Sequence, residues 1–182
     1  NKLESGEIVL EYEPFDIYDI FDDIFTLNEQ NAYKHNISLT FEKCENIHNR
    51  LIGSPLHVKR VLMNIISNAV KYGREGGYVK VSCKELSVTE DGKTAMLSIK
   101  CEDNGKGIGE DFRKVMYEPF RQENESARTS YQGTGLGLPI AKRLTEKMGG
   151  TIECESTKNV GTDFTIVLPL DIDMTRQSKS KP

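Results

Sequence analysis

Two pairs of β-rich segments, each joined by a turn, constrain the fold of this chain most. The runs 79–88 and 94–102 flank Glu90-Asp91-Gly92-Lys93, a sequence typical of a hairpin turn. The runs 151–155 and 162–168 alternate apolar and polar residues around a second turn. Because the predicted strands and helices do not follow one another as βαβ units, we predict an α+β fold with one mixed sheet and helices on one face.

Three amphipathic segments are predicted to form the main helices. Apolar residues recur with helical period from Ile17 to about His35. A second helix follows Ser54, a good N-cap, with Pro55 at its first position and Gly73 just past its end. A third helix covers 136–148. The shorter predicted elements are an extended piece at 7–15, a strand at 37–41, a helix at 110–116 and a polar loop at 118–132.

The composition fits a soluble globular domain and excludes several classes of function. The chain has 182 residues, enough for one hydrophobic core, and a formal net charge of −4, which argues against a nucleic-acid partner. No apolar run approaches the roughly 20 residues of a membrane span, and the start does not resemble a signal peptide. The four cysteines form no C-x-x-C pair and are expected to be reduced core thiols: Cys44, Cys83, Cys101 and Cys154.

The helix predicted after Ser54 carries an unusual polar face. On a helical wheel Asn64, Asn68 and Lys71 lie together, opposite the apolar residues. A solvated face is the simplest interpretation, but asparagine is a mediocre helix former. Two amides one turn apart beside an ammonium group also suit a phosphate and metal site. An amide oxygen can complete the coordination of Mg²⁺, and the ammonium group attracts phosphates.

Two glycine-rich motifs follow this helix in the sequence. In DNGKGIG, at 103–109, Asp103 ends a predicted strand and can accept a hydrogen bond from an exocyclic amine, while the glycines allow close approach to a flat ligand. A plain strand-to-helix turn is the alternative. GTGLGL, at 133–138, opens a predicted helix, where exposed N–H groups can bind an anion. Neither motif is a dinucleotide fingerprint, and the chain has no G-x-x-x-x-G-K-[ST] phosphate loop.

Taken in order, the motifs resemble those of a known family. NIISNAVKY, DNGKGIG, YEPF and GTGLGL resemble the N, first G, F and second G boxes of the sensor histidine kinase catalytic and ATP-binding domain. GTDF at 161–164 resembles the last glycine motif of that family, and the resemblance spans about 14–169. It implies the fold shared with gyrase and the Hsp90 chaperones, the Bergerat-type ATP-binding fold. That fold is a two-layer α/β sandwich with a mixed sheet of about five strands.

The resemblance assigns roles to the polar face of the predicted helix. Asn64 and Lys71 become the catalytic candidates, and Asn68 is expected to coordinate Mg²⁺ through its amide oxygen. Asn64, Lys71 and Tyr72 are expected to line the phosphate and ribose side of ATP. Gyrase-like ATPases resembling this fold carry glutamate at the position of Asn64, as a general base for water. Because an amide cannot take up a proton, we expect poor hydrolysis of ATP and transfer of its γ-phosphoryl group to an external nucleophile.

The glycine motifs are expected to hold the rest of the nucleotide. By resemblance, Asp103 binds the adenine amino group, with Gly107 and Thr162 beside the base, and Phe120 anchors a lid at 119–132. An arginine of that lid, Arg121 or Arg128, is the candidate for a contact with the γ-phosphate. The remaining expected nucleotide-binding residues are Gly105, Ile108, Gly133, Thr134, Gly135, Leu136, Gly137 and Leu138.

The phosphoacceptor of the family is absent from this sequence. None of the three histidines, His35, His48 and His57, lies in an acceptor motif of the His-Glu type. We therefore expect 1–13 to be the remainder of a join to an upstream dimerisation and phosphoacceptor domain. Residues 14–170 would form the catalytic domain and 171–182 a linker or tail.

The resulting functional hypothesis is the ATP-binding catalytic domain of a two-component sensor histidine kinase, with ATP as substrate and Mg²⁺ as cofactor. Its expected partners are the upstream phosphoacceptor domain and the receiver domain of a response regulator. The isolated domain is expected to be a monomer and its parent a homodimer, anchored in a bacterial membrane with this domain in the cytoplasm. The alternatives are a serine kinase or ATPase of the same superfamily, such as an anti-sigma-factor kinase, and a nucleotide-binding interaction module without transfer activity.

Overall fold

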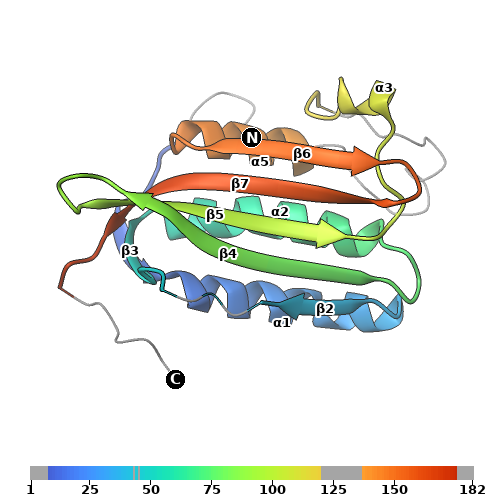
Figure 1. Ribbon diagram of the computed structural model, residues 1–182, viewed down its shortest axis with the longest axis horizontal. Helices are drawn as coiled ribbons and strands as arrows, with labels where there is room; N and C mark the ends of the chain where they lie inside the picture. Colours follow the sequence, from blue (N-terminus) through green and yellow to red (C-terminus); the bar gives the residue numbers. More distant parts are fainter. Residues whose placement is uncertain (1–7, 43, 45, 120–136, 176–182) are drawn as a thin grey trace.

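The computed structural model describes residues 8–42, 44, 46–119 and 137–175. Within these ranges one mixed sheet is covered on one face by helices α1, α2 and α5 (Figure 1), which confirms the α+β prediction. The helices are α1 (Ile17–Lys34), α2 (Pro55–Lys71), α3 (Glu110–Arg113) and α5 (Gly137–Lys147). The strands are β1 (Glu13–Asp16), β2 (Ser38–Phe41), β3 (Arg50–Gly53), β4 (Tyr78–Val88), β5 (Thr94–Asp103), β6 (Thr151–Thr157) and β7 (Gly161–Ile172).

The sheet has seven strands, where the sequence predicts about five. The strand order is β1-β3-β7-β5-β4-β2, and β6 also pairs with β7. β2 and β4 are parallel, and the other pairs are antiparallel. Of the two additional strands, β1 overlaps the extended piece predicted at 7–15, whereas β3 was not predicted. They belong to the sheet because β3 pairs with both β1 and the end of β7.

β7 is the central strand of the sheet and determines where the functional motifs meet. β5 pairs with it along one edge, while β6 and β3 share the other edge. Asp103 and Ser156 therefore both lie opposite Thr162, one on each side of it. This arrangement brings the start of the first glycine motif next to the last one.

The hydrophobic core lies between the sheet and the helices. Alternate residues of β5 and β7 face this layer and are buried, as Leu97, Ile99 and Leu168 illustrate. α2 contributes Leu62, Ile65 and Ile66, each about 1% exposed. Complete burial of such a side chain contributes roughly 1.5–3 kcal/mol to stability, so α2 is firmly held on the sheet. Cys44, Cys83 and Cys101 are buried free thiols, as predicted, and Cys154 is half-buried.

The start of α2 corrects one detail of the sequence prediction. Ser54 occupies the N-cap position, but its side chain does not cap the helix. Its Oγ instead accepts a hydrogen bond from the Glu11 N–H (3.0 Å) and lies 2.6 Å from His57 Nδ1. The Glu11 carboxylate accepts the hydrogen bond from the Leu56 N–H, at 3.3 Å. Because this acceptor comes from 45 residues earlier in the chain, no local pattern could predict it.

The ends of the described chain pack onto the sheet. β7 continues to Ile172, where it pairs with Leu51 of β3, so the predicted start of the tail at 171 falls inside a strand. At the other end, the Tyr12 hydroxyl donates a hydrogen bond to the Asp171 carboxylate. The predicted helix at 110–116 is helical only over α3, and most of the predicted loop at 118–132 lies outside the described residues. Among the residues that the structure describes, no helix could span a membrane.

Candidate functional site

The polar face of α2 includes one buried amide nitrogen without a hydrogen-bond partner among the described residues. Asn64 Nδ2 is the only buried side-chain nitrogen or oxygen of this kind in the described parts of the chain. A buried amide that donates no hydrogen bond costs roughly 1–3 kcal/mol, so such a group is normally matched by a partner. Asn68 follows one turn later on the same half-buried face. An amide donor held in this state is suited to an oxygen of a ligand.

The end of α2 contacts the turn of the first glycine motif. Burial lowers the pKa of Lys71, whose Nζ lies 5.3 Å from the ring centroid of Tyr72. The Tyr72 carbonyl accepts a hydrogen bond from the Lys106 N–H, at 3.4 Å. A Cβ added to Gly105 would lie 2.7 Å from the Tyr72 carbonyl oxygen, closer than real contacts allow. Glycine at this position therefore lets the turn lie against the helix end.

Asp103 lies at the end of β5 as a partly buried carboxylate. It accepts a hydrogen bond from the Gly105 N–H, at 2.9 Å, and another from the Thr162 N–H. Burial raises the pKa of Asp103 to about 6, although the two N–H donors favour the charged form and lower it. The carboxyl group is held in a fixed orientation by backbone groups of two different segments. Such a group can accept a hydrogen bond from an amine on a ligand.

The turn after Asp103 forms hydrogen bonds with the β6–β7 hairpin. Gly107 has a φ of 66°, and a Cβ there would lie 2.0 Å from the Thr157 carbonyl oxygen, so glycine is required for both reasons. The Lys106 carbonyl accepts a hydrogen bond from the Asn159 N–H, at 2.6 Å. The Ile108 N–H donates to Ser156 Oγ, at 2.7 Å. Sequence reasoning did not single out Ser156. Its only local signal is a hydroxyl residue on the face of β6 that also carries Ile152 and Cys154.

The start of α5 lies beside the polar face of α2. A Cβ added to Gly137, the first residue of α5, would lie 3.7 Å from Asn68 Nδ2. Leu138 is half-buried and packs against the core. The structure therefore brings the N, first G and last glycine motifs together with the start of α5. The other predicted residues of the lid and second G box lie outside the described residues: Phe120, Arg121, Arg128, Gly133, Thr134, Gly135 and Leu136.

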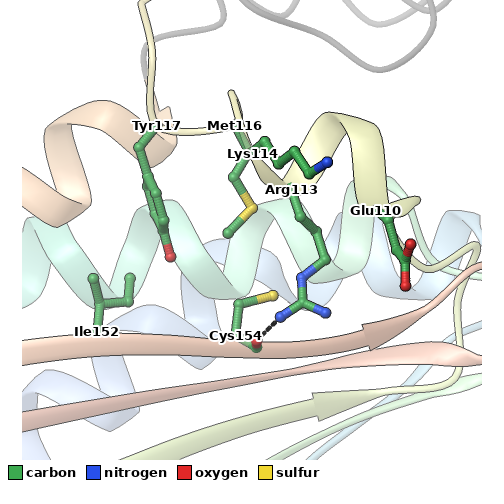
Figure 2. Close-up of a pocket in the computed structure, with 7 residues that line it drawn as sticks. All are labelled: Glu110, Arg113, Lys114, Met116, Tyr117, Ile152 and Cys154. Carbon is green, nitrogen blue, oxygen red and sulfur yellow. Dashed lines mark hydrogen bonds between the residues drawn. The ribbon is translucent and has the colours of Figure 1, made fainter.

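A separate pocket of about 420 Å³ lies between β6 and the segment from α3 to Tyr117 (Figure 2). Met116 and Tyr117 point toward the Cys154 and Ile152 side chains, and Arg113 donates a hydrogen bond to the Cys154 carbonyl. Burial raises the pKa of Tyr117 to about 12, and Lys142 Nζ of α5 lies 4.5 Å from its ring centroid. None of the described residues predicted to bind the nucleotide lines this pocket.

The described groups divide into two chemically different ends. At one end, Asp103, Thr162 and the 105–108 turn offer a carboxylate and a hydroxyl to a flat polar ligand. At the other end, α2 offers two amides and an ammonium group beside the start of α5. No cluster of three or more His, Cys, Asp or Glu side chains suited to a metal occurs among the described residues, so a metal here would need amide oxygens and ligand oxygens.

Comparison with known proteins agrees with this geometry. Residues 53–172 match the family described as histidine kinase-, DNA gyrase B- and HSP90-like ATPase. The chain is 35% identical over 170 residues to the sensor histidine kinase GacS of Pseudomonas protegens, covering 93% of this chain and 18% of GacS.

Solved structures give the same assignment. The catalytic domain of the histidine kinase ThkA is 26% identical, with a TM-score of 0.71, over 87% of this chain and 95% of that domain. Full-length ShkA, solved in complex with AMPPNP, shares the fold at 24% identity and a TM-score of 0.74, over 94% of this chain and 33% of ShkA. The chain belongs to the histidine kinase-, gyrase B- and HSP90-like ATPase family, and its fold is that of a histidine kinase catalytic domain. It spans about a fifth of the length of GacS.

Proposed function

We propose that this chain binds ATP with Mg²⁺ and transfers the γ-phosphoryl group to a histidine on a separate helical domain. The observation that carries the proposal is the buried Asn64 Nδ2, which has no hydrogen-bond partner among the described residues and lies on the same helix face as Asn68 and Lys71. This face ends at the turn that follows Asp103. A ligand that bridges the two ends needs an amine-bearing base at one end and phosphates at the other, and ATP has both.

Asp103 supplies the base-recognition group in this proposal. Its carboxylate accepts a hydrogen bond from the adenine 6-amino group, while the Gly105 and Thr162 N–H groups hold it in place. Gly107 lets the turn pass close to the β6–β7 hairpin. Recognition of the base therefore rests on groups that the fold already orients.

The residues of α2 fit a metal and phosphate site. The Asn68 amide oxygen is a hard ligand of the kind that Mg²⁺ prefers, and the unpartnered Asn64 Nδ2 can donate to a phosphate oxygen. Mg²⁺ held there would neutralise charge on the phosphate oxygens. Lys71, whose ammonium group is partly buried, would add positive charge beside the phosphates. These groups position and neutralise the phosphoryl group without forming a covalent bond to it.

Asn64 favours transfer over hydrolysis. An amide side chain cannot remove a proton from water near neutral pH, so the described face offers no carboxylate base at this position. We propose that the nucleophile is a histidine of an upstream dimerisation domain, and that a response regulator receives the phosphoryl group next. The similarity to GacS and to ThkA, both named histidine kinases, supports this choice. We also infer that the parent protein is a homodimer anchored in a membrane.

Asn68→Ala tests the metal role that this function requires. Purified chain is mixed with a histidine-containing dimerisation domain, and transfer from ATP is followed with and without Mg²⁺. We expect the variant to lose transfer by about 100-fold, the effect of losing roughly 2.7 kcal/mol, while its circular dichroism and melting temperature stay unchanged. Asn31→Ala, at an exposed position of α1, is the matched control. Transfer at the wild-type rate would contradict the assignment.

The acid stability of the product distinguishes a histidine kinase from a serine kinase. Loss of the product's label in acid identifies phosphohistidine, whereas an acid-stable product indicates a serine kinase.

A further inference from the structure

Ser156 links the two segments that carry the base-recognition groups. It lies on β6, half-buried, directly opposite Thr162 of β7 in the strand register. Its Oγ is 2.7 Å from the Ile108 nitrogen, 3.0 Å from the Gly161 carbonyl oxygen and 2.7 Å from Thr162 Oγ1. One hydroxyl group therefore contacts the turn after Asp103 and two consecutive residues of β7.

The donors and acceptors at this junction determine how its protons are placed. Ser156 Oγ accepts the proton of the Ile108 N–H, because a backbone amide can only donate. Its own single proton goes to the Gly161 carbonyl, which can only accept. The Thr162 hydroxyl must then donate to Ser156 Oγ, since no other proton is left for that contact. In this arrangement all three contacts are satisfied, and Thr162 Oγ1 keeps lone pairs that can only accept.

The same strand register connects this acceptor to Asp103. Thr162 lies opposite both Ser156 and Asp103, and its N–H donates to the Asp103 carboxylate. The base site therefore offers two acceptors, the Asp103 carboxylate and Thr162 Oγ1. A 6-amino group on a purine has two protons for such acceptors. A 6-oxo group at the same position would bring a third acceptor against them, which is unfavourable.

We propose that Ser156 is a positioning residue for purine selection: it fixes the Thr162 hydroxyl as an acceptor and so favours a 6-aminopurine over a 6-oxopurine. The inference rests on the proposed ATP-binding function. Ser156 acts on the base indirectly, through its hydrogen bonds to Thr162 and to Ile108 of the 105–108 turn. When the Ser156 hydroxyl is absent, the Thr162 hydroxyl loses its acceptor. It can then turn toward the base and donate a hydrogen bond to a 6-oxo group.

Ser156→Ala and Ser156→Thr test this role against a merely structural one. Binding of ATP and of inosine triphosphate, which differ in the 6-amino and 6-oxo groups, is measured by displacement of a fluorescent ATP analogue. In the wild-type chain we expect clear preference for ATP. In Ser156→Ala we expect ATP affinity to fall about tenfold, or about 1.4 kcal/mol, and the affinity for inosine triphosphate to stay the same or rise. Ser156→Thr keeps the hydroxyl and should restore the preference. Ser82→Ala, at a half-buried position of β4, is the control.

Each result either supports or overturns the inference. Equal loss of affinity for the two nucleotides, or no loss, shows that Ser156 does not act on selection, although ATP binding itself would stand. A wild-type chain that binds neither nucleotide would overturn the proposed function and this inference together.

Thr162→Val tests the same contact from the opposite strand if Ser156→Ala fails to fold. It removes the positioned hydroxyl and should reduce the preference for ATP to a similar extent. In the double variant Ser156→Ala/Thr162→Val the two losses should not add, because both act through one hydrogen bond. Additive losses would contradict the proposed link between the two hydroxyl groups.

Discussion

The two ends of the candidate site differ in how far the chain satisfies its own polar groups. At the base end, the Asp103 carboxylate, the Ile108 N–H and the Ser156 hydroxyl all have hydrogen-bond partners within the chain. At the phosphate end, Asn64 Nδ2 is buried without one among the described residues. The difference indicates that the fold orients the base-recognition groups before a ligand arrives, whereas the phosphate end keeps a donor that a ligand would complete.

The largest expected effect comes from Asp103→Asn at the base end. The variant loses the charged acceptor for the amino group, and a charged hydrogen bond contributes up to about 3 kcal/mol. We therefore expect ATP affinity to fall about 100-fold or more by isothermal titration calorimetry. Asp163→Asn is the matched control, because that carboxylate lies one residue from Thr162 but forms an exposed ion pair with Lys100 at 3.5 Å. Unchanged affinity in Asp103→Asn would remove the base end from the site.

An intermediate effect, with opposite signs for stability and binding, is expected from Asn64→Leu at the phosphate end. Replacing an unpartnered buried amide by an apolar group of similar size removes a desolvation cost, so the free energy of unfolding without ligand should rise by about 1 kcal/mol. ATP affinity should fall about tenfold, because a donor to the phosphates is lost.

Asn28→Leu provides the contrasting control for this experiment. Asn28 is 2% exposed, but its amide donates to the Ile24 carbonyl at 2.9 Å and accepts from the Ser67 hydroxyl at 3.2 Å. Loss of these partners should lower the free energy of unfolding by about 1–3 kcal/mol in urea denaturation. If both substitutions destabilise the chain equally, Asn64 Nδ2 does not carry the unpaired desolvation cost that we describe for the phosphate end.

The smallest expected effect, about twofold at pH 6, is the pH dependence of the base end. The pKa of Asp103 is raised to about 6, so the carboxylate required for binding is half protonated near that pH. ATP affinity should fall about twofold at pH 6 and about tenfold at pH 5, relative to pH 8. In Asp103→Asn the carboxyl group is absent, so any pH dependence that remains comes from the titration of ATP itself. In the wild-type chain the ¹³C chemical shift of the Asp103 carboxyl group reports the titration of that group directly. A midpoint near pH 4 would show that burial does not control this group.

The same shift has the opposite consequence for the ligand-free chain. A carboxyl group whose pKa is higher in the folded state than in the unfolded state lowers stability as pH rises from about 4 to about 6. The ionised Asp103 is therefore a stability cost that the ligand-free protein carries above this range. The cost is consistent with a residue kept for recognition, since its N–H partners offset only part of it.

Local patterns were sufficient for the main helices and for the placement of Asp103. The helical period and the flanking Pro55 and Gly73 defined α2, and β-rich composition defined β4 and β5. β3 was missed because Arg50-Leu51-Ile52-Gly53 does not alternate between polar and apolar residues, as the equally short β2 does. The Ser54 cap was wrong because the acceptor at the start of α2 comes from Glu11, far away in the chain. Ser156 could be found only from the strand register, which no local pattern gives. The roles predicted for the lid residues stay predictions.

The Glu11 carboxylate at the start of α2 has a practical consequence for shortening this chain. α2 carries Asn64, Asn68 and Lys71, yet its first N–H groups depend partly on a side chain that precedes the first strand. A version that begins at Glu13 would keep every strand and helix described here but would lose that acceptor and the backbone contact to Ser54. Its α2 should exchange amide hydrogens faster from Leu56 onward. The hydrogen bonds at the start of α2 therefore require residues that lie further toward the N-terminus than the first strand of the sheet.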